Sequence, residues 1–321
     1  MNQPAPAITV VIPNYNQREL LRTCLQSLAG QSRPARVLVV DDGSEDGSAQ
    51  MVARDFPHFE CLELERNRGF AAAANQGLRR VETPFSALLN NDAEAHPDWI
   101  AAGLEAFQRL PECGLLASKM VDFYDRTRLD AAGDLYNRRG LPLKRGHGRP
   151  QKEYQEETEV LGASAGAAFY RTSMLRELGF LDESYYMYLE DVDLSLRARL
   201  AGYRCRFIPQ AVVYHMEAGS DPRRSRQSGP GVYYSPSRVY WITRNRWRLM
   251  WTYQPPSNAP WLLYGWVKSA LFHLLKAGYF GSFLKGSAQA AAALPGDLKK
   301  RRRLFRHSRI PKSELWKQFR S

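Results

Sequence analysis

Three carboxylates lie close together at Glu190, Asp191 and Asp193, directly before a run with helical spacing. Crowding of like charges raises the pKa of one carboxyl, whereas a helix N-terminus lowers it, so such a cluster can poise one carboxylate as a proton acceptor. Ordinary acidic residues in the first turn of a helix have the same spacing. The cluster therefore indicates either a general base or a plain helix start.

A second kind of chemistry is indicated by Asp92, which ends the segment Asn90-Asn91-Asp92 after an apolar run. A carboxylate at a strand edge can hold a hard divalent cation, Mg²⁺ or Mn²⁺, that keeps some waters and shares phosphate oxygens. His215, at the end of a later apolar run, is a second candidate ligand. Taken alone, an Asp after a strand is more often a turn or cap residue, and a lone His is more often structural.

The elements that must position these residues are short apolar runs that alternate with segments of helical spacing. This alternation predicts an α/β fold with right-handed βαβ units and a parallel sheet covered on both faces. The expected strands are residues 8–12, 37–40, 61–64 and 85–89, and the expected helices include residues 19–29 and 71–81. Ligands of such sheets bind beyond the carboxyl ends of the strands.

Each expected strand runs into a small polar cluster. The clusters are Pro13-Asn14-Tyr15-Asn16, Asp41-Asp42-Gly43-Ser44, Arg66-Asn67-Arg68-Gly69 and Asn90-Asn91-Asp92. Any one of them is equally well explained by turn formers and helix caps. All four at one sheet edge would form a single pocket, which turn preferences alone do not explain.

Beyond this half, residues 111–160 mix Gly, Arg and Asp with little periodicity, and we expect them to form a loop-rich cover over the pocket. Order resumes in residues 161–220, where a strand at 211–214 is predicted to end at His215. The apolar residues that mark a helix there are Leu189, Val192, Leu196 and Leu200.

The composition fits a globular protein with one large core and a smaller appendage, since 44% of its 321 residues are hydrophobic. Its four cysteines are far apart and form no CxxC pair, which argues against a disulfide framework or a zinc ribbon. The first residues lack a basic segment followed by an apolar one, so no export signal is expected. A reducing cytosol is the expected location.

The net charge of +12 is unevenly distributed. Residues 201–321 contain 22 Lys and Arg against 4 Asp and Glu, whereas residues 1–200 contain 23 against 29. The acidic part is suited to bind cations, and the basic part is suited to an anionic partner such as a phospholipid surface, a pyrophosphate or nucleic acid.

The segment 261–283 is apolar and aromatic but is interrupted by Lys268, His273 and Lys276, and a basic run follows at 299–303. A spanning helix needs about 20 apolar residues with few charges, so we expect this segment to lie in a membrane interface rather than to cross it. The alternative is a helix that covers the preceding domain or forms a homodimer contact, followed by a solvated tail.

Six segments occur in a characteristic order: ITVVIPNYN, VVDDGSEDGS, NRGFAAAANQG, LLNNDAEA, GFLDESYYMYLEDVDLSLRARLAGY and VVYHMEAGS. Together they resemble glycosyltransferase family 2, in particular rhamnosyltransferase-type enzymes of bacterial cell-wall and O-antigen (lipopolysaccharide) assembly. The resemblance covers about residues 8–250. It implies a GT-A type, Rossmann-like, mostly parallel sheet flanked by helices.

The resemblance also implies a domain division and residue roles. Residues 1–250 would form the catalytic domain, with a nucleotide-sugar half at about 1–120 and an acceptor half at about 121–250, and residues 251–321 would form a basic amphipathic helical extension. Asp42, or its neighbour Asp41, would hydrogen-bond a pyrimidine base. The implied nucleotide-binding residues are Pro13, Tyr15, Asp41, Asp42, Asn67, Gly69, Asn75 and Asn91.

The metal motif of the family is usually Asp-x-Asp, but only Asp92 matches it here, so the resemblance implies either weaker metal binding or an ion shared with His215. Asp191, with Glu190 beside it, matches the catalytic base of the family. This base implies attack on the anomeric carbon opposite the leaving diphosphate, and therefore inversion.

The implied function is a metal-dependent, inverting hexosyltransferase acting at the inner face of the cytoplasmic membrane. Its donor would be dTDP-L-rhamnose or, failing that, a UDP- or GDP-sugar, and its acceptor a lipid-linked or polysaccharide molecule of the bacterial surface. Processive relatives carry Gln-x-x-Arg-Trp, where this chain has Arg244-Asn245-Arg246-Trp247, so we expect few sugars per encounter. A non-catalytic sugar-nucleotide binder or membrane scaffold is the alternative, and no nucleic-acid-reading motif is present.

Overall fold

Ten strands form one sheet in the computed structural model, which describes residues 6–217, 235–275 and 279–319. Eight of them follow the order β10-β12-β6-β11-β4-β1-β2-β3, while β5 pairs with β12 and β7 pairs with β6. The strands are β1 Ile8–Asn14, β2 Arg36–Asp41, β3 Glu60–Glu63, β4 Phe85–Leu89, β5 Ala93–Ala95, β6 Cys113–Asp122, β7 Leu129–Ala131, β10 Thr158–Val160, β11 Ala167–Arg171 and β12 Arg204–His215.

The half of the sheet made by β4, β1, β2 and β3 is parallel, as the sequence predicts. Strand β11 is antiparallel to both β4 and β6, whereas β12 runs parallel to β6. Asn14 at the end of β1 is in register with Asp41 at the end of β2. The polar clusters that follow these strands therefore lie at one edge.

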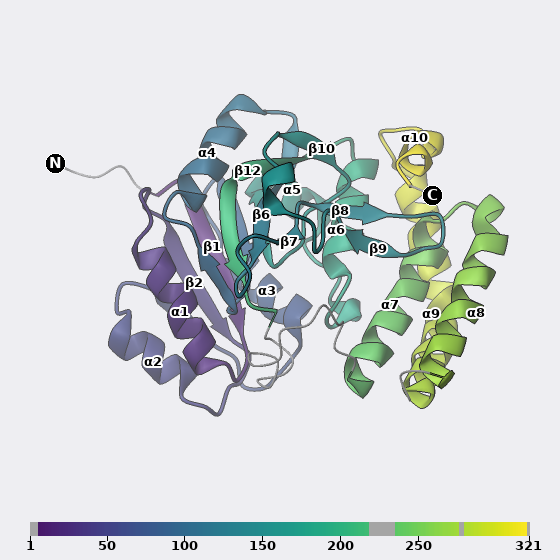
Figure 1. Cartoon of the computed structure of the whole chain (residues 1–321), viewed down its shortest axis with the longest axis horizontal. Coiled ribbons are helices and arrows are strands. Elements are labelled where there is room, and N and C mark those ends of the chain that lie inside the picture. Colours follow the sequence, from purple (N-terminus) through teal and green to yellow (C-terminus); the bar gives the residue numbers. More distant parts are fainter. Residues whose placement is uncertain (1–5, 218–234, 276–278, 320–321) are drawn as a thin grey trace.

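Helices cover both faces of the sheet (Figure 1). Alternate residues of β1 point to opposite sides, because Val10 and Ile12 pack with one core cluster and Val11 packs with the other. The first face is covered by α1 Arg18–Ala29, α2 Ser48–Asp55 and α4 Trp99–Arg109, and the second by α3 Phe70–Leu78, α5 Thr172–Leu178 and α6 Glu190–Leu200. The predicted α/β, GT-A type architecture is confirmed.

The expectation of a loop-rich cover at 111–160 is wrong, because this region supplies β6, β7 and β10 to the sheet. Strand β6 is buried along nearly its whole length, so it lacks the alternation that marks a half-buried strand. The other strands of the region are three residues long, too short for periodicity, and include the hairpin of β8 Asp134–Tyr136 and β9 Pro142–Lys144. The strand expected at 211–214 is the end of β12.

The C-terminal helices α7 Pro236–Tyr253, α8 Ala259–Leu275 and α9 Phe280–Arg306 lie side by side at one end of the molecule (Figure 1). A third core cluster joins Leu196 of α6 to Leu249 of α7 and to Leu315 of α10 Lys312–Lys317. Helix α7 crosses residue 250, and the predicted domain division remains a prediction. Within the described ranges, every helix is too short or too polar to span a bilayer.

Candidate active site

Side-chain hydrogen bonds connect the ends of β1, β2 and β4. Asn14 Nδ2 donates to Asp41 Oδ2 at 3.0 Å, and Asn91 Nδ2 donates to Asn14 Oδ1 at 2.7 Å. Asp41 Oδ1 accepts from the backbone N–H of Ser44 at 2.8 Å. Three of the four predicted polar clusters are therefore joined through Asn14.

The fourth cluster is joined through Asp42. Its two carboxylate oxygens accept from the backbone N–H groups of Arg68 and Gly69, each at 2.9 Å. Burial raises the pKa of Asp42, although these hydrogen bonds and the Arg68 charge oppose the shift. Asp42 thus fixes the loop that carries Asn67 and Gly69 against the end of β2.

Tyr186 completes this edge and was not predicted as a site residue. Its hydroxyl donates to Asn67 Oδ1 at 2.7 Å. This contact and its ring against Gly69 place Tyr186 among the predicted nucleotide-binding residues, and burial together with nearby Asp42 and Tyr15 raises the pKa of its phenol. Gly69 has φ +86, and a Cβ there would come within 2.4 Å of the Tyr186 ring, so both backbone and packing require glycine. The only signal was the position of Tyr186 shortly before the acidic cluster.

Of the other predicted nucleotide-binding residues, Pro13 is buried in β1 and Tyr15 is exposed. Asn75 is fully buried, and its amide exchanges hydrogen bonds with the backbone of Leu181 and donates to Glu183. These contacts join α3 to the segment before α6, and a contact of Asn75 with the nucleotide remains a prediction.

The predicted metal ligands lie together. His215 Nε2 is 3.2 Å from Asp92 Oδ1, and His215 Nδ1 is 3.0 Å from Asp130 Oδ2. All three residues are buried. A histidine whose second nitrogen is held by a carboxylate is the usual arrangement of a metal-bound histidine. Asp130, in β7, was missed because it lies in the region expected to be loop.

Asp130, His215 and Glu217 also bring ligand atoms within 4.8 Å of one another. Lys144 Nζ, however, lies 2.6 Å from Asp130 Oδ1 and 2.7 Å from Glu217 Oε1, so these carboxylates already have a cation. Burial would lower the pKa of His215, but Asp92 and Asp130 outweigh it and raise the pKa to about 10. A divalent ion fits better between Asp92 and His215 Nε2, where it would displace the imidazolium proton.

The acidic cluster divides into two parts. Asp191 Oδ2 accepts from the backbone N–H of Ala165 at 3.0 Å, and burial raises the pKa of Asp191. Burial and the Asp191 charge also raise the pKa of Glu190, and no described residue donates a hydrogen bond to Glu190 Oε2. Asp193 instead pairs with Arg197 at 2.8 Å and Lys300 at 2.6 Å, which gives it a structural role.

The metal-ligand pair and the acid pair are linked through the loop before β11. Gly166 O accepts from the backbone N–H of Asn90 at 2.9 Å, and the preceding residue, Ala165, donates to Asp191. Asn90 Nδ2 in turn lies 3.5 Å from His215 Nε2. The Lys144 charge also lowers the pKa of Asp191 while Lys144 pairs with Asp130. These contacts place both pairs at the same edge as Asp41 and Asp42.

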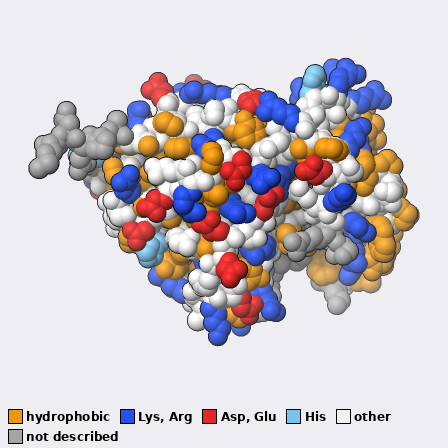
Figure 2. Space-filling view, turned by 90° about the horizontal axis from the view of Figure 1, so that it is seen from above, with side chains coloured by type: hydrophobic (Ala, Val, Ile, Leu, Met, Phe, Trp, Pro, Cys, Tyr) orange, Lys and Arg blue, Asp and Glu red, His pale blue; other side chains and the backbone are white. Residues whose placement is uncertain are grey.

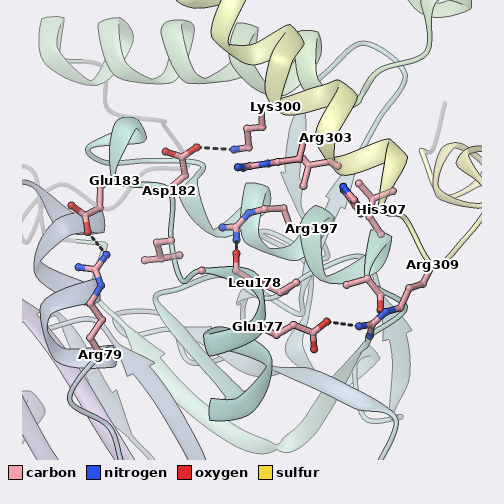
Figure 3. A pocket seen from close by; sticks show the side chains of 15 residues that line it. Arg79, Glu177, Leu178, Asp182, Glu183, Arg197, Lys300, Arg303, His307 and Arg309 are labelled. Atoms are coloured by element: carbon pink, nitrogen blue, oxygen red, sulfur yellow. Dashed lines mark hydrogen bonds and ion pairs between the residues drawn. The ribbon is translucent and has the colours of Figure 1, made fainter.

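A cavity of about 760 Å³ lies elsewhere, between α5, α6 and α9 (Figure 3). Its charged side chains largely pair with one another, as Arg79 does with Glu183, Arg309 with Glu177 and Lys300 with Asp182, each at 2.7 Å. It contains none of the predicted site residues among its lining. We therefore assign it no part in the chemistry.

Arg244 and Arg246, in the segment compared above with Gln-x-x-Arg-Trp, contact backbone carbonyls. Arg244 donates to Ser184 O, and Arg246 donates to Arg139 O and Gly140 O. Both therefore hold chain segments together.

The chain belongs to glycosyl transferase family 2, whose model matches residues 9–179. It is 29% identical over 240 residues to N-acetylglucosaminyl-diphospho-decaprenol L-rhamnosyltransferase of Mycobacterium tuberculosis, covering 67% of this chain and 78% of that protein. The structure resembles S. aureus TarS 1-349 in complex with UDP-GlcNAc, with a TM-score of 0.57, 19% identity and coverage of 93% and 90%. It also resembles mannosyltransferase PcManGT from Pyrobaculum calidifontis in complex with GDP-Man and Mn²⁺, with a TM-score of 0.54, 18% identity and coverage of 94% and 86%. The structural likenesses show the fold.

Proposed function

We propose that the protein is an inverting, metal-dependent hexosyltransferase that moves a sugar from a nucleotide diphosphate to a lipid-linked or polysaccharide acceptor. One observation carries the proposal: hydrogen bonds join Asp41 and Asn14 to the segment Asn90-Asn91-Asp92 that pairs with His215, and the backbone of the same segment bonds the loop at 165–166 that holds Asp191. A donor site, a cation site and a base would then share one edge of the sheet.

In this proposal the nucleoside is held by the carboxylates and amides at the ends of β1 and β2, with Tyr186 facing them. Asp92 and His215 Nε2 would hold Mg²⁺ or Mn²⁺, and Asp130 would orient the imidazole. When bound, such an ion neutralises the charge that develops on the leaving diphosphate. The residues that would contact the nucleotide are Pro13, Tyr15, Asp41, Asp42, Asn67, Gly69, Asn91 and Tyr186.

Asp191 is the proposed general base. Its carboxylate would take the proton of the acceptor hydroxyl while the hydroxyl oxygen forms a bond to the anomeric carbon and the bond from that carbon to the diphosphate breaks. Attack from the face opposite the leaving group inverts the configuration. The raised pKa of Asp191, caused by its burial, makes it a better proton acceptor than an ordinary aspartate.

The donor we propose first is dTDP-L-rhamnose, followed by UDP- or GDP-sugars. The support is the similarity to a relative named as an L-rhamnosyltransferase of a lipid-linked N-acetylglucosamine. The same relative supports a lipid-linked acceptor in bacterial surface glycan synthesis.

We also propose reversible binding to the anionic inner face of the cytoplasmic membrane. Helix α8 exposes apolar side chains, among them Leu263 at 64% and Leu275 at 75%. Figure 2 shows apolar side chains gathered at the end of the molecule built by these helices, with Lys and Arg nearby. In the basic run, Lys300 and Arg301 bind inward, to Asp193 and to backbone carbonyls, and Arg303 lines the cavity of Figure 3, which leaves Lys299 and Arg302 to meet lipid phosphates. Lys276 lies outside the described residues. The alternative is that a second copy of the chain covers this face of α8 in a homodimer.

A panel of nucleotide sugars, tested with Mg²⁺ or Mn²⁺ and membrane extract, examines the proposal. We expect one donor both to raise the melting temperature and to be consumed, and Asp191→Asn to lower turnover by about 10²–10⁴-fold. A non-catalytic binder would be stabilised by a donor without consuming it, and Asp191→Asn would then change nothing.

A further inference from the structure

A buried asparagine of α7 holds the loop that leads into the acid pair. Asn245 is fully buried, and its Nδ2 lies 2.9 Å from Tyr185 O, 2.8 Å from Met187 O and 2.8 Å from Tyr188 O. Its Oδ1 accepts from Arg244 Nη1 at 2.8 Å. One side-chain amide therefore binds three nearby carbonyls of the loop and is itself fixed in orientation by its neighbour.

The loop at residues 184–189 has a backbone conformation that residues other than glycine rarely adopt. Tyr186, Tyr188 and Leu189 have φ values of +65, +67 and +70, which side chains with a Cβ rarely adopt. Such conformations persist only where surrounding groups enforce them. Because Asn245 binds carbonyls on both sides of Tyr186, it is well placed to enforce this path.

Two arginines of α7 fix the start of the same loop. Arg244 Nη1 donates to Ser184 O at 2.9 Å, and Arg248 Nη1 donates to Ser184 O at 3.0 Å and to its hydroxyl at 2.8 Å. Arg248 is itself held by Asp297 of α9. The C-terminal helices thus clamp residues 184–188 from one side.

The two ends of the loop are anchored unequally. Tyr186 has further support from the Asn67 side chain, from the backbone N–H of Ala71 and from stacking on Trp241 at 4.7 Å. Leu189, directly before Glu190, begins α6 with a left-handed backbone and no side-chain cap. The Asp191 carboxylate also accepts from the backbone N–H of Ala165, so Asn245 acts on the segment that leads into the acid pair, through the carbonyls of Met187 and Tyr188.

We propose that Asn245 is a positioning residue that holds Glu190 and Asp191 in the orientation needed for proton removal, an inference that rests on the proposed function. Its side chain does not reach the acid pair. It acts through the carbonyls of Tyr185, Met187 and Tyr188, and so makes the C-terminal helices part of the catalytic framework.

Asn245→Asp tests this inference, because aspartate has the same shape but presents an oxygen to the three carbonyls in place of the donor. Asn245→Ser, which is uncharged and keeps one donor, serves as a second variant in case the aspartate prevents folding. The matched control is Asn258→Asp: Asn258 is also buried and donates through Nδ2, to Gln254 Oε1 at 2.7 Å, but it does not contact the loop.

The measurements are kcat and donor KM with dTDP-L-rhamnose and the UDP- and GDP-sugars, with membrane extract as acceptor, and hydrogen exchange of residues 184–191. We expect Asn245→Asp to lower kcat tenfold or more, to change donor KM less than threefold and to speed exchange in this loop. Asn245→Ser should have a smaller effect in the same direction. The Asn258→Asp variant should match wild type in all three measurements.

If both Asn245 variants keep the kcat and the loop exchange rate of the wild type, the inference is overturned and the proposed function still stands. An equal fall of kcat in the Asn258→Asp control also overturns it, because the effect is then general instability. If wild-type protein consumes no donor, the proposed function fails and the catalytic part of the inference fails with it, while exchange still decides whether Asn245 holds the loop.

Discussion

His215 Nε2 lies 3.2 Å from Asp92 Oδ1 at the end of two strands that are more than a hundred residues apart in the sequence. The orientation of the imidazole is fixed by Asp130, whose carboxylate lies 3.0 Å from His215 Nδ1. The proposed cation site therefore depends on three residues: Asp92 and His215 as ligands, and Asp130 as the residue that orients His215.

The Asp130→Asn variant tests this dependence. Loss of the carboxylate behind His215 should weaken Mn²⁺ binding about 10–100-fold, the usual effect of removing such a partner. The measurement is a calorimetric Mn²⁺ titration in the presence of dTDP. Asp125→Asn removes an exposed carboxylate of the same region and should leave the affinity unchanged. Equal affinities in the Asp130→Asn variant and the wild type would place the ion elsewhere.

The pH dependence of kcat/KM should reflect the buried acid pair. Burial raises the pKa of Asp191 above its ordinary value, and the base works only when deprotonated. As the solution is acidified, kcat/KM should therefore begin to fall at a higher pH than it would if the base had the pKa of an ordinary aspartate. A kcat/KM profile that stays flat until the protein unfolds would rule out Asp191 as the base.

The Glu190→Gln variant should be more stable than the wild type at neutral pH. Burial and Asp191 raise the pKa of Glu190 in the folded state, so ionisation opposes folding once the pH rises through that pKa. Glutamine is neutral at every pH and removes this penalty. We expect a melting temperature about 2–4 °C higher at pH 8, and no gain at pH 4. A lower melting temperature at pH 8 would mean that Glu190 is stabilised by a partner.

Lys300 should contribute strongly to stability. Its ammonium lies 2.6 Å from Asp193 and 2.7 Å from Asp182, and Asp193 is fully buried. Burial would raise the pKa of Asp193, but Lys300 and Arg197 lower it, so this stability is present above the unfolded-state pKa and is lost as the pH falls through the folded-state value. Lys300→Met should cost about 3–5 kcal/mol in urea unfolding at pH 7.

The neighbouring Lys299 provides the control for this variant. It belongs to the same turn of α9 but is exposed, so Lys299→Met should change the unfolding free energy by no more than about 0.5 kcal/mol. Equal losses in the two variants would assign the effect to the helix and not to the buried ion pairs.

Membrane binding should depend on the apolar face of α8. The double variant Leu271→Glu and Leu275→Glu places charges on exposed apolar positions and should abolish flotation with vesicles that contain phosphatidylglycerol. Added salt should weaken wild-type binding. Leu143→Glu, at an exposed position on the β8–β9 hairpin, is the control. Vesicle binding unaffected by the double variant would favour a protein partner on this face.

The sequence predicts the parallel half of the sheet because its strands are apolar runs that end in polar clusters. It does not reveal Asp130 or Lys144, which lie in strands of three residues that are too short to show a periodic pattern. It suggests Asn75 as a ligand contact, which remains a prediction, and it does not reveal that the buried amide exchanges hydrogen bonds with the backbone of Leu181. The role of Asn245 depends on contacts about 60 positions away, which periodicity does not encode.

The central claim is that the donor site, the cation site and the base lie together at one edge of the sheet. Its most direct test is a crystal structure of the protein with dTDP and Mn²⁺. Our account predicts one Mn²⁺ bound by Asp92 and His215 and by the diphosphate, the thymine beside Asp41 and Asp42, and the Asp191 carboxylate facing the space beyond the terminal phosphate. An ion bound away from Asp92, or a diphosphate with Asp191 turned away from it, would contradict the account.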